Sequence, residues 1–253
     1  MHAIILAAGR GKRLAEFNPD GRPKCLLEFG GRSLLARQLD ILFRLGVRHL
    51  TLVIGFEAER IIEHVGTMSS RPDVAFAYNP AYTDGSALSL LAAHEALTSD
   101  ETVLLLNADL LFHPQIMRTL VDSSIPNCFL IDRNFSAGDE PVKIAMDRGE
   151  ILEFRKVLPV DLQYDTLGVS VGFFKFNGEI AAKIARICET YQTEGFLDAP
   201  HEEALRNVLL AQPSAFACED VSGLPWLDVD TPEDVERAIK RILPAIRKDY
   251  PDF

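Results

Sequence analysis

The chain has 253 residues, of which 47% are hydrophobic, and carries a formal net charge of −11. Such a length and composition are those of a globular protein with one large domain or two small ones. The acidic charge argues against nucleic acid as a partner, because phosphate backbones bind basic surfaces. No apolar run approaches the roughly 20 residues that a membrane helix needs, and the apolar run at the N-terminus is too short for a signal peptide. We therefore expect a cytoplasmic protein with no membrane partner.

The cysteines do not indicate a zinc site or a disulfide framework. Cys25, Cys128, Cys188 and Cys218 lie far apart in the sequence, and no two of them form a Cys-x-x-Cys pair. Spacing of this kind is typical of cysteines that act as small buried apolar residues.

A short apolar segment near the N-terminus runs into a turn that is rich in positive charge. Residues 3–6 carry no charge and are typical of a buried strand in a parallel sheet. Gly9 and Gly11 follow; glycines let a backbone approach a ligand closely, and successive N–H groups in such a turn bind anions. The cations of this region are Arg10, Lys12, Arg13 and, at the end of a polar loop, Lys24. The segment predicts a loop that holds a small phosphorylated ligand, with an ordinary strand-to-helix turn as the alternative.

Two familiar phosphate-binding loops do not fit this segment. The Walker loop needs four residues between its first glycine and a Gly-Lys-Ser/Thr, and that pattern is absent. The dinucleotide fingerprint needs a third glycine three residues after the second, where this chain has Leu14. Because Gly-x-Gly after a strand is a weak signal by itself, the prediction of a phosphate loop depends on the cations.

Strands and helices alternate through the first half of the chain. Apolar strands are expected at residues 50–54, 74–78 and 102–106, and an amphipathic helix at 57–65. This alternation implies right-handed crossovers and a mostly parallel sheet. The second half differs, because a hairpin-like turn at 147–149 joins two short strands and a long apolar strand follows them.

Polar side chains follow two of the expected strands, at the edge of the sheet where open α/β folds bind ligands. A polar loop with Asn79, Gly85 and Ser86 comes after one strand, and Asp109 comes after another. A carboxylate in this place suits a hard cation such as Mg²⁺. The alternatives are local: Asp109 can cap the next turn, and Ser86 can be the N-cap of a helix that runs to Leu97.

A second motif lies near the C-terminus. Thr231 as N-cap, Pro232 as first helical residue and Asp234 three after the cap predict a strong helix start. That role does not explain Asp228 and Asp230, which are two residues apart on an expected strand and so point to the same side. Like charges placed in this way repel each other unless a cation lies between them.

The segment Leu6-Ala7-Ala8-Gly9-Arg10-Gly11-Lys12-Arg13-Leu14, followed by Pro23-Lys24-Cys25-Leu26-Leu27, resembles the signature of the nucleotidyltransferases that activate sugar-1-phosphates and phospho-alcohols. The motif at 226–234 resembles the C-terminal motif of the same family. The resemblance implies an α/β, Rossmann-like nucleotidyltransferase fold with a central mixed, mostly parallel sheet flanked by helices, and a small antiparallel portion in the second half. Since no linker interrupts the chain, we expect a single domain over 1–253, with an NTP-binding half at 1–125 and an acceptor-binding half at 126–253.

The resemblance also assigns roles to residues that match the motifs. Arg13 and Lys24 would hold the phosphates of a nucleoside triphosphate, and Asp109, Asp228 and Asp230 would hold Mg²⁺. The loop that wraps the nucleotide would consist of Leu6, Ala7, Ala8, Gly9, Gly11 and Lys12.

The nucleobase side of the site follows from the same resemblance. Asn79, Gly85 and Ser86 would contact the base, and their loop is most similar to the cytidylyltransferase branch. A turn followed by an N-cap would satisfy the same residues.

Two further residues have an implied role and a local alternative. In the resembling cytidylyltransferases a lysine near Lys143 approaches the phosphates, but a lysine in a strand can also face solvent by alternation. An acidic residue near Glu202 lies by the acceptor in the phosphocholine branch, but acids are also favoured at any helix start.

The resemblance therefore implies Mg²⁺-dependent transfer of a nucleotidyl group to a small phosphorylated acceptor, with release of pyrophosphate. CTP and a phospho-alcohol such as phosphocholine are the favoured substrates. A sugar-1-phosphate or inositol-phosphate nucleotidyltransferase is the enzymatic alternative. A non-catalytic nucleotide-binding domain on the same fold is the other, although none of the predicted metal or phosphate ligands is lost.

Overall fold

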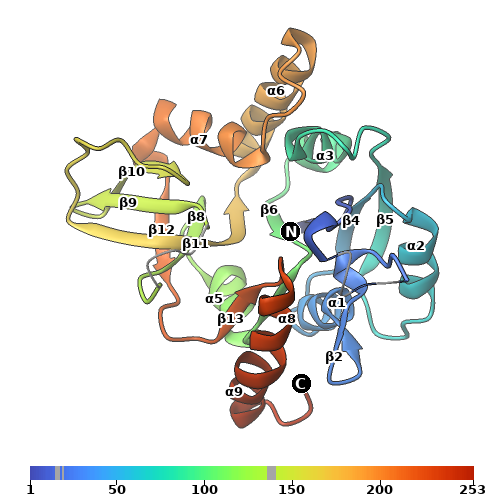
Figure 1. The fold of residues 1–253 in the computed structure, drawn as a ribbon. Helices are drawn as coiled ribbons and strands as arrows, with labels where there is room; N and C mark the ends of the chain where they lie inside the picture. The colour runs from blue at the N-terminus through green and yellow to red at the C-terminus, as the bar shows by residue number, and fades with distance from the viewer. Residues whose placement is uncertain (15–17, 19, 136–140) are drawn as a thin grey trace.

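The structure, a computed structural model, describes residues 1–14, 18, 20–135 and 141–253. A nine-stranded sheet runs through its centre in the order β10-β9-β11-β6-β1-β4-β5, with β8 paired to β11 and to β12 (Figure 1). Its strands are β1 His2–Leu6, β4 His49–Ile54, β5 Asp73–Tyr78, β6 Val103–Asn107, β8 Cys128–Asp132, β9 Lys143–Asp147, β10 Glu150–Arg155, β11 Thr166–Phe176 and β12 Ala217–Asp220. Two small antiparallel ladders join β2 Glu28–Phe29 to β3 Arg32–Ser33, and β7 Leu110–Phe112 to β13 Trp226–Asp228.

The half of the sheet built from β1, β4, β5 and β6 is parallel, as predicted. The other half is antiparallel, because β11 pairs in that sense with β6, β8 and β9, and β9 with β10. The long strand β11 changes partner along its length, from β9 at Thr166 to β6 at Phe176. Gly172 lies at the irregularity in this strand with φ +80°, and a Cβ there would come within 2.8 Å of Asn107 Nδ2. The expected mixed sheet with an antiparallel second half is confirmed.

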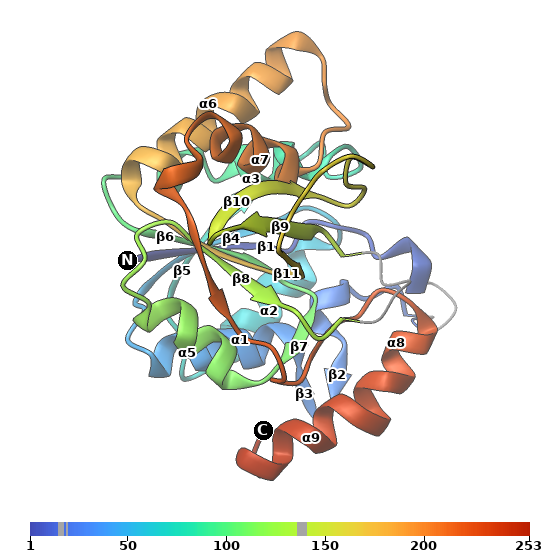
Figure 2. The ribbon, with the colours of Figure 1, turned by 90° about the vertical axis from the view of Figure 1, so that its left-hand side faces the viewer.

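Helices cover both faces of the sheet: Figure 2 shows α6 and α7 on one side and α1 and α5 on the other. The helices are α1 Leu34–Arg44, α2 Ala58–Gly66, α3 Ser86–Ala92, α4 His94–Leu97, α5 Pro114–Asp122, α6 Gly178–Glu194, α7 His201–Ala211, α8 Pro232–Arg237 and α9 Leu243–Asp249, with a π-helical segment at Ala238–Ile242 between the last two. Within the described residues, no helix combines the length and the apolar character that a membrane crossing requires.

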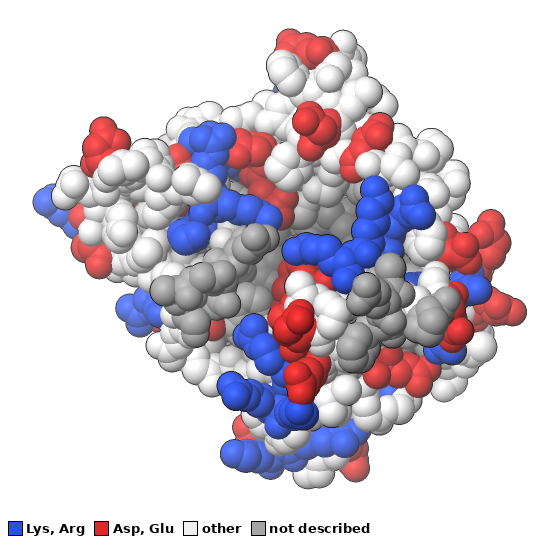
Figure 3. All heavy atoms as spheres, in the orientation of Figure 1, with Lys and Arg blue, Asp and Glu red and all other residues white. Residues whose placement is uncertain are grey.

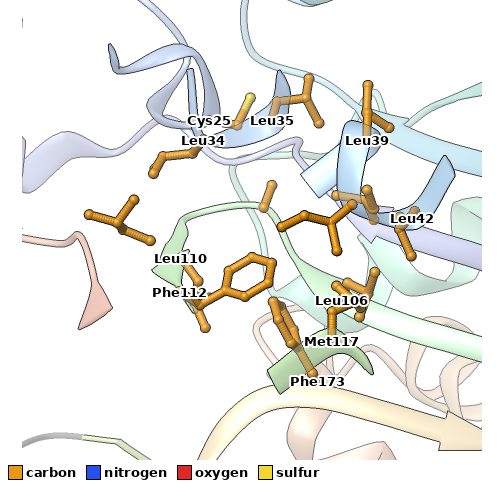
Figure 4. Close-up of a cluster of buried hydrophobic side chains, with 14 of the residues drawn as sticks. Cys25, Leu34, Leu35, Leu39, Leu42, Leu106, Leu110, Phe112, Met117 and Phe173 are labelled. Atoms are coloured by element: carbon orange, nitrogen blue, oxygen red, sulfur yellow. The ribbon is translucent and has the colours of Figure 1, made fainter. Parts of the chain in front are cut away.

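The core has one cluster on each face of the sheet, because successive side chains of a strand point to opposite faces. Ala3 and Ile5 belong to the cluster with α1 and α5, whereas Ile4 and Ala8 belong to the cluster with α3, α6 and α7. Figure 4 shows part of the first cluster, where Leu106 and Phe173 of the sheet lie near Met117 of α5. These clusters fix β1 and β6, whose carboxyl ends carry the predicted functional residues.

Of the two predicted N-caps, Thr231 is confirmed and Ser86 is wrong. Thr231 forms a capping box with Asp234. Ser86, in contrast, is the first residue of α3 rather than its N-cap, and α3 ends at Ala92 instead of Leu97. The reason is tertiary: Ala87 N donates to the carbonyl of Ala199, and the Ser86 hydroxyl is bonded to α7 instead.

A buried ion pair ties the antiparallel half of the sheet to α7. Arg206 Nε and Nη2 each donate to one carboxylate oxygen of Glu153 at 2.6 Å, and Glu153 is 5% exposed. Burial alone would raise the pKa of Glu153, but the hydrogen bonds from Arg206 lower it below its ordinary value. The ionised form therefore stabilises the fold above the ordinary glutamate pKa, and this contribution is lost as the pH falls through the lower pKa of the folded state.

We expect Glu153→Gln to lower the free energy of unfolding at pH 7 by about 2–3 kcal/mol, because a charge-assisted pair is broken in a buried place. The loss should shrink as the pH falls through the lowered pKa of Glu153 in the folded wild type, because the carboxylate then becomes protonated and the pair is lost there too. Chemical denaturation at several pH values measures both effects. Glu179→Gln is the matched control, since it breaks the Glu179–Lys183 pair on α6, whose carboxylate is exposed. Equal losses in the two variants at pH 7, or a loss that does not shrink at low pH, would contradict the prediction.

Candidate active site

Two neighbouring cavities lie at the carboxyl ends of the parallel strands, and Arg13 and Asp230 line both. The first cavity has a volume of about 440 Å³ and the second about 710 Å³. Figure 3 shows Lys and Arg side chains on both sides of the hollow in this face, with acidic side chains between them. The first cavity contains nine of the predicted residues: Leu6, Ala7, Gly9, Gly11, Lys12, Arg13, Lys24, Asp109 and Asp230.

The glycine-containing loop closes one side of the first cavity. It leaves β1 at Leu6 and turns into a single 3₁₀ turn at Lys12–Leu14. Gly11 has φ +59°, and a Cβ on it would lie 3.2 Å from Lys24 Cβ. This glycine therefore allows both the left-handed turn and the close approach of Lys24. Ala8, which was predicted in this loop, instead points into the apolar core and is 2% exposed.

Lys24 lies at the centre of the predicted metal ligands. Its Nζ atom donates to Asp109 Oδ2 at 2.8 Å, to Asp228 Oδ1 at 3.1 Å and to Asp230 Oδ1 at 2.5 Å. Arg13 Nη2 donates to the other oxygen of Asp230 at 2.7 Å. The sequence therefore identified a cluster that the structure assembles from segments more than 200 residues apart.

The small β7–β13 ladder explains how the carboxylates converge. It pairs Asp228 with Leu110, next to Asp109, and Val229 N donates to the Asp109 carbonyl. Asp230 lies two residues beyond the end of β13, not on the strand as predicted, yet its side chain reaches the same ammonium group. The capping box of α8 holds this segment, because Asp234 also accepts from Asp230 N.

Lys24 and the three aspartates shift one another's pKa values. Burial alone would lower the pKa of Lys24, but the three carboxylates raise it above its ordinary value, so Lys24 stays charged. Burial and the neighbouring Asp109 raise the pKa of Asp228. Burial would also raise the pKa of Asp230, but Lys24 and Arg13 hold it below its ordinary value. When all three carboxylates are ionised, they exceed the two cations that pair with them by one negative charge.

This donor set fits a hard divalent cation. One oxygen of each aspartate lies within 4.8 Å of the other two. Asp109 Oδ1 is buried and, among the described residues, has no hydrogen-bond partner, so a ligand oxygen is available. Carboxylate oxygens are the ligands that Mg²⁺ prefers. The excess negative charge and the unpaired oxygen both favour a cation there.

The predicted base-contacting residues have structural partners, and other residues of the same loop line the first cavity. Asn79 is 3% exposed, donates to Ser89 Oγ and accepts from Ala81 N. A Cβ on Gly85 would collide with the Ala199 carbonyl at 2.2 Å. None of Asn79, Gly85 and Ser86 lines the cavity, so their contact with a base stays a prediction.

Tyr82 and Thr83 line the first cavity and were missed by the sequence reasoning. Both lie in the polar loop that was singled out, between Asn79 and Gly85. The signal that could have found them is their position at the tip of that loop, where a tyrosine offers a flat ring to a base.

The second cavity is lined by Glu202, as expected, and by a lysine that was not predicted. Lys156 lines this cavity, whereas Lys143 does not and donates from Nζ to the Lys156 carbonyl at 2.8 Å. The two lysines lie at the same edge of the β9–β10 hairpin, where Lys143 is paired with Arg155. The role of Lys143 at the phosphates stays a prediction.

Acidic and aromatic residues also line the second cavity. Asp132 is 8% exposed and accepts a hydrogen bond from Trp226 Nε1 at 2.8 Å. Trp226 therefore has a fixed orientation, and it also packs against the hydrophobic core. Both residues line the cavity together with Asn134 and Glu233. The cavity therefore offers carboxylates, a ring and at least one lysine to a ligand.

No nucleophilic side chain in the described part of the site is activated. Burial raises the pKa of the Cys25 thiol to about 12, with a contribution from Asp109, so it stays protonated at neutral pH. His201 is 4% exposed and its Nδ1 is bonded to Ser86 Oγ and lies 3.2 Å from Glu202. Neither group is placed to form a covalent intermediate.

Known proteins resemble this chain over most of its length. Residues 3–151 match the family described as the MobA-like NTP transferase domain. The chain is 28% identical over 249 residues to the "Bifunctional IPC transferase and DIPP synthase" of Rubrobacter xylanophilus, covering 95% of this chain and 52% of that protein. It is 26% identical over 248 residues to the "UTP--glucose-1-phosphate uridylyltransferase" of Haloferax volcanii, covering 96% of each. The solved structure of the inositol-1-phosphate CTP transferase from T. maritima superposes with a TM-score of 0.76 at 19% identity, over 98% of this chain and 96% of that one, which supports the fold.

We expect Lys24→Met to bind Mn²⁺, as a probe of the metal site, about tenfold or more tightly than the wild type when no nucleotide is present. The reason is that the Lys24 ammonium competes for the three carboxylates that would hold the metal. Electron paramagnetic resonance of free Mn²⁺ measures the affinity. Lys12→Met is the matched control, because Lys12 lines the same cavity but forms no ion pair with Asp109, Asp228 or Asp230. Equal affinities of Lys24→Met and the wild type would contradict the competition, and unchanged binding in Asp109→Asn would contradict the metal site.

Proposed function

Because the chain belongs to the family of MobA-like NTP transferase domains, we propose that it transfers a nucleotidyl group from a nucleoside triphosphate to a phosphomonoester and releases pyrophosphate. CTP is the favoured donor, a phospho-alcohol such as phosphocholine the favoured acceptor, and Mg²⁺ the metal. One observation carries the proposal: a cavity with a phosphate-type loop and a cavity for a second ligand meet at Arg13 and Asp230, and Asp230 belongs to the carboxylate cluster around Lys24.

The reaction needs little covalent chemistry from the protein. An oxygen of the acceptor phosphate forms a bond to the α-phosphorus, the bond from that phosphorus to the bridging oxygen breaks, and pyrophosphate leaves. A phosphomonoester has a second pKa of about 6 and is largely dianionic at neutral pH, so no strong base is required. The protonated Cys25 and the hydrogen-bonded His201 are consistent with this mechanism.

The residues of the first cavity would supply positioning and charge. Backbone N–H groups of the loop at 9–11 would cradle the triphosphate, and Lys24 and Arg13 would bind its oxygens. A divalent cation held by Asp109, Asp228 and Asp230 would neutralise the charge of the reacting phosphates.

The second cavity supports a cationic phospho-alcohol. Its acidic residues Asp132, Glu202 and Glu233, and the ring of Trp226, are groups that attract an ammonium ion. Lys156 would face the phosphate of the same molecule. A sugar-1-phosphate or inositol phosphate remains the enzymatic alternative, because neutral polar groups such as Asn134 also line this cavity, and the relatives' names include transfer to glucose-1-phosphate.

The substrate pair is tested by mixing the protein and Mg²⁺ with each of the four common NTPs, crossed with phosphocholine, phosphoethanolamine, inositol phosphate and hexose-1-phosphates. We expect pyrophosphate release to be fastest with CTP and an amino-alcohol phosphate, because the second cavity pairs carboxylates with a lysine. Release only with a sugar-1-phosphate would overturn the acceptor assignment and leave the reaction class intact. Tight NTP binding without release for any pair would favour the non-catalytic alternative.

We expect Lys156→Met to lower kcat/KM for the acceptor about tenfold to hundredfold, which is the cost of one charged hydrogen bond to a phosphate. Lys183→Met is the matched control, since Lys183 pairs with Glu179 on α6 and does not line the cavity, and it should cost no more than about twofold. Lys143→Met loses a hydrogen bond to the Lys156 carbonyl and should cost less than Lys156→Met. Steady-state kinetics with the acceptor varied and the NTP saturating gives all three numbers. A larger loss in Lys143→Met than in Lys156→Met would restore the role first assigned to Lys143.

A further inference from the structure

Two residues that line the second cavity, Lys156 and Glu202, are each next in the sequence to a member of one ion pair. Lys156 directly follows Arg155, the last residue of β10, and Glu202 directly precedes Glu203 in the first turn of α7. Arg155 Nε donates to Glu203 Oε1 at 3.1 Å. Lys156 and Glu202 line the cavity, while Arg155 and Glu203 do not.

We propose that the Arg155–Glu203 ion pair is a positioning bridge, which sets the separation of Lys156 and Glu202 at the second cavity and thereby its affinity for the acceptor. The inference rests on the proposed function in that it takes this cavity as the acceptor site. Arg155 and Glu203 act through their neighbours and do not touch the acceptor.

The bridge belongs to a chain of four alternating charges. Glu203 also lies 3.8 Å from Arg206, and Arg206 holds the buried Glu153 by two hydrogen bonds. Glu153 and Arg155 both lie on β10, and Glu203 and Arg206 both lie on α7. The inner pair, Glu153–Arg206, holds α7 against β10. The outer pair, Arg155–Glu203, extends this connection to the residues next to Lys156 and Glu202.

Exposure separates the roles of the two pairs. The side chains of Arg206 and Glu153 are 17% and 7% exposed, whereas those of Arg155 and Glu203 are 46% and 29% exposed. An ion pair as exposed as the outer one contributes only about 0–1 kcal/mol to stability. Its loss should therefore leave the fold intact, and an effect on the acceptor would come from geometry.

Apart from the bridge itself, different contacts hold its two ends, Glu203 on α7 and Arg155 on β10. On α7, Ser86 Oγ accepts from His201 N, and Glu202 lies 3.2 Å from His201 Nδ1, so α3 also restrains this end. On β10, the strand ends at Arg155, and Lys156 starts the segment that leads to β11. Lys143 donates a hydrogen bond to the Lys156 carbonyl. The bridge restrains Arg155, the residue before Lys156.

The test compares Arg155→Met with Arg155→Lys and with the remote control Glu179→Gln. We expect Arg155→Met to raise the acceptor KM roughly three- to tenfold, while the KM for the NTP changes by less than about twofold. Arg155→Lys should restore part of the loss, and Glu179→Gln should change neither KM. The midpoint of thermal unfolding should stay within about 2 °C of the wild type in all three variants.

Hydrogen–deuterium exchange without substrates is a second readout that needs no activity. We expect Arg155→Met to exchange faster at residues 156–160 and 200–206 and to match the wild type elsewhere. Unchanged exchange in both segments, or an equal rise of the two KM values, would overturn the bridge. If the wild type transfers no nucleotide to any acceptor, the proposed function fails, and the exchange experiment alone decides on the bridge.

Discussion

The ammonium group of Lys24 is the contact on which the site depends. It is buried, and its charge is tolerated only because carboxylates from three other positions surround it. Each carboxylate in turn would repel the others without a cation among them. The cluster therefore links the segment after β1, the end of β6 and the β13–α8 connection, so that the N-terminal and C-terminal thirds of the chain meet at one point.

The charge balance of this cluster also explains why two ligands of opposite sign suit the same place. With Lys24 and Arg13 beside them, the three carboxylates have one excess negative charge when all are ionised, which would attract a cation. Under the proposed function, a divalent cation held there would reverse that sign and favour phosphate oxygens nearby. Lys24 would then share its hydrogen bonds with the phosphates, since it has three donors on a flexible stem.

The sequence could predict those parts of the site that follow from strand ends and helix caps. Asp109 follows a buried strand and the Asp228–Asp230 pair precedes a capping box, so both positions follow from local rules. Ser86 and Lys143 show where prediction from local sequence rules fails, because tertiary contacts decide the outcome at both positions. Ser86 has the right type for an N-cap, but the backbone of the α6–α7 connection caps α3 and leaves the hydroxyl to His201. For Lys143 and Lys156, which share one edge of a hairpin, only the packing of β10 against α7 decides which lysine lines the cavity.

The two cavities differ in how their walls are built, and this difference bears on specificity. The first is built from tight backbone turns at strand ends, where Gly11 leaves no room for a side chain beside Lys24. The second is lined largely by residues of β11 and of the segment 223–237, and also by Lys156 after β10 and Glu202 on α7. Long charged side chains hold β10 and α7 together. Under the proposed function, a substitution in the first cavity would disturb the phosphate chemistry, whereas one in the β10–α7 contacts would shift Lys156 and Glu202. Acceptor preference would then change while the cluster around Lys24 stays the same.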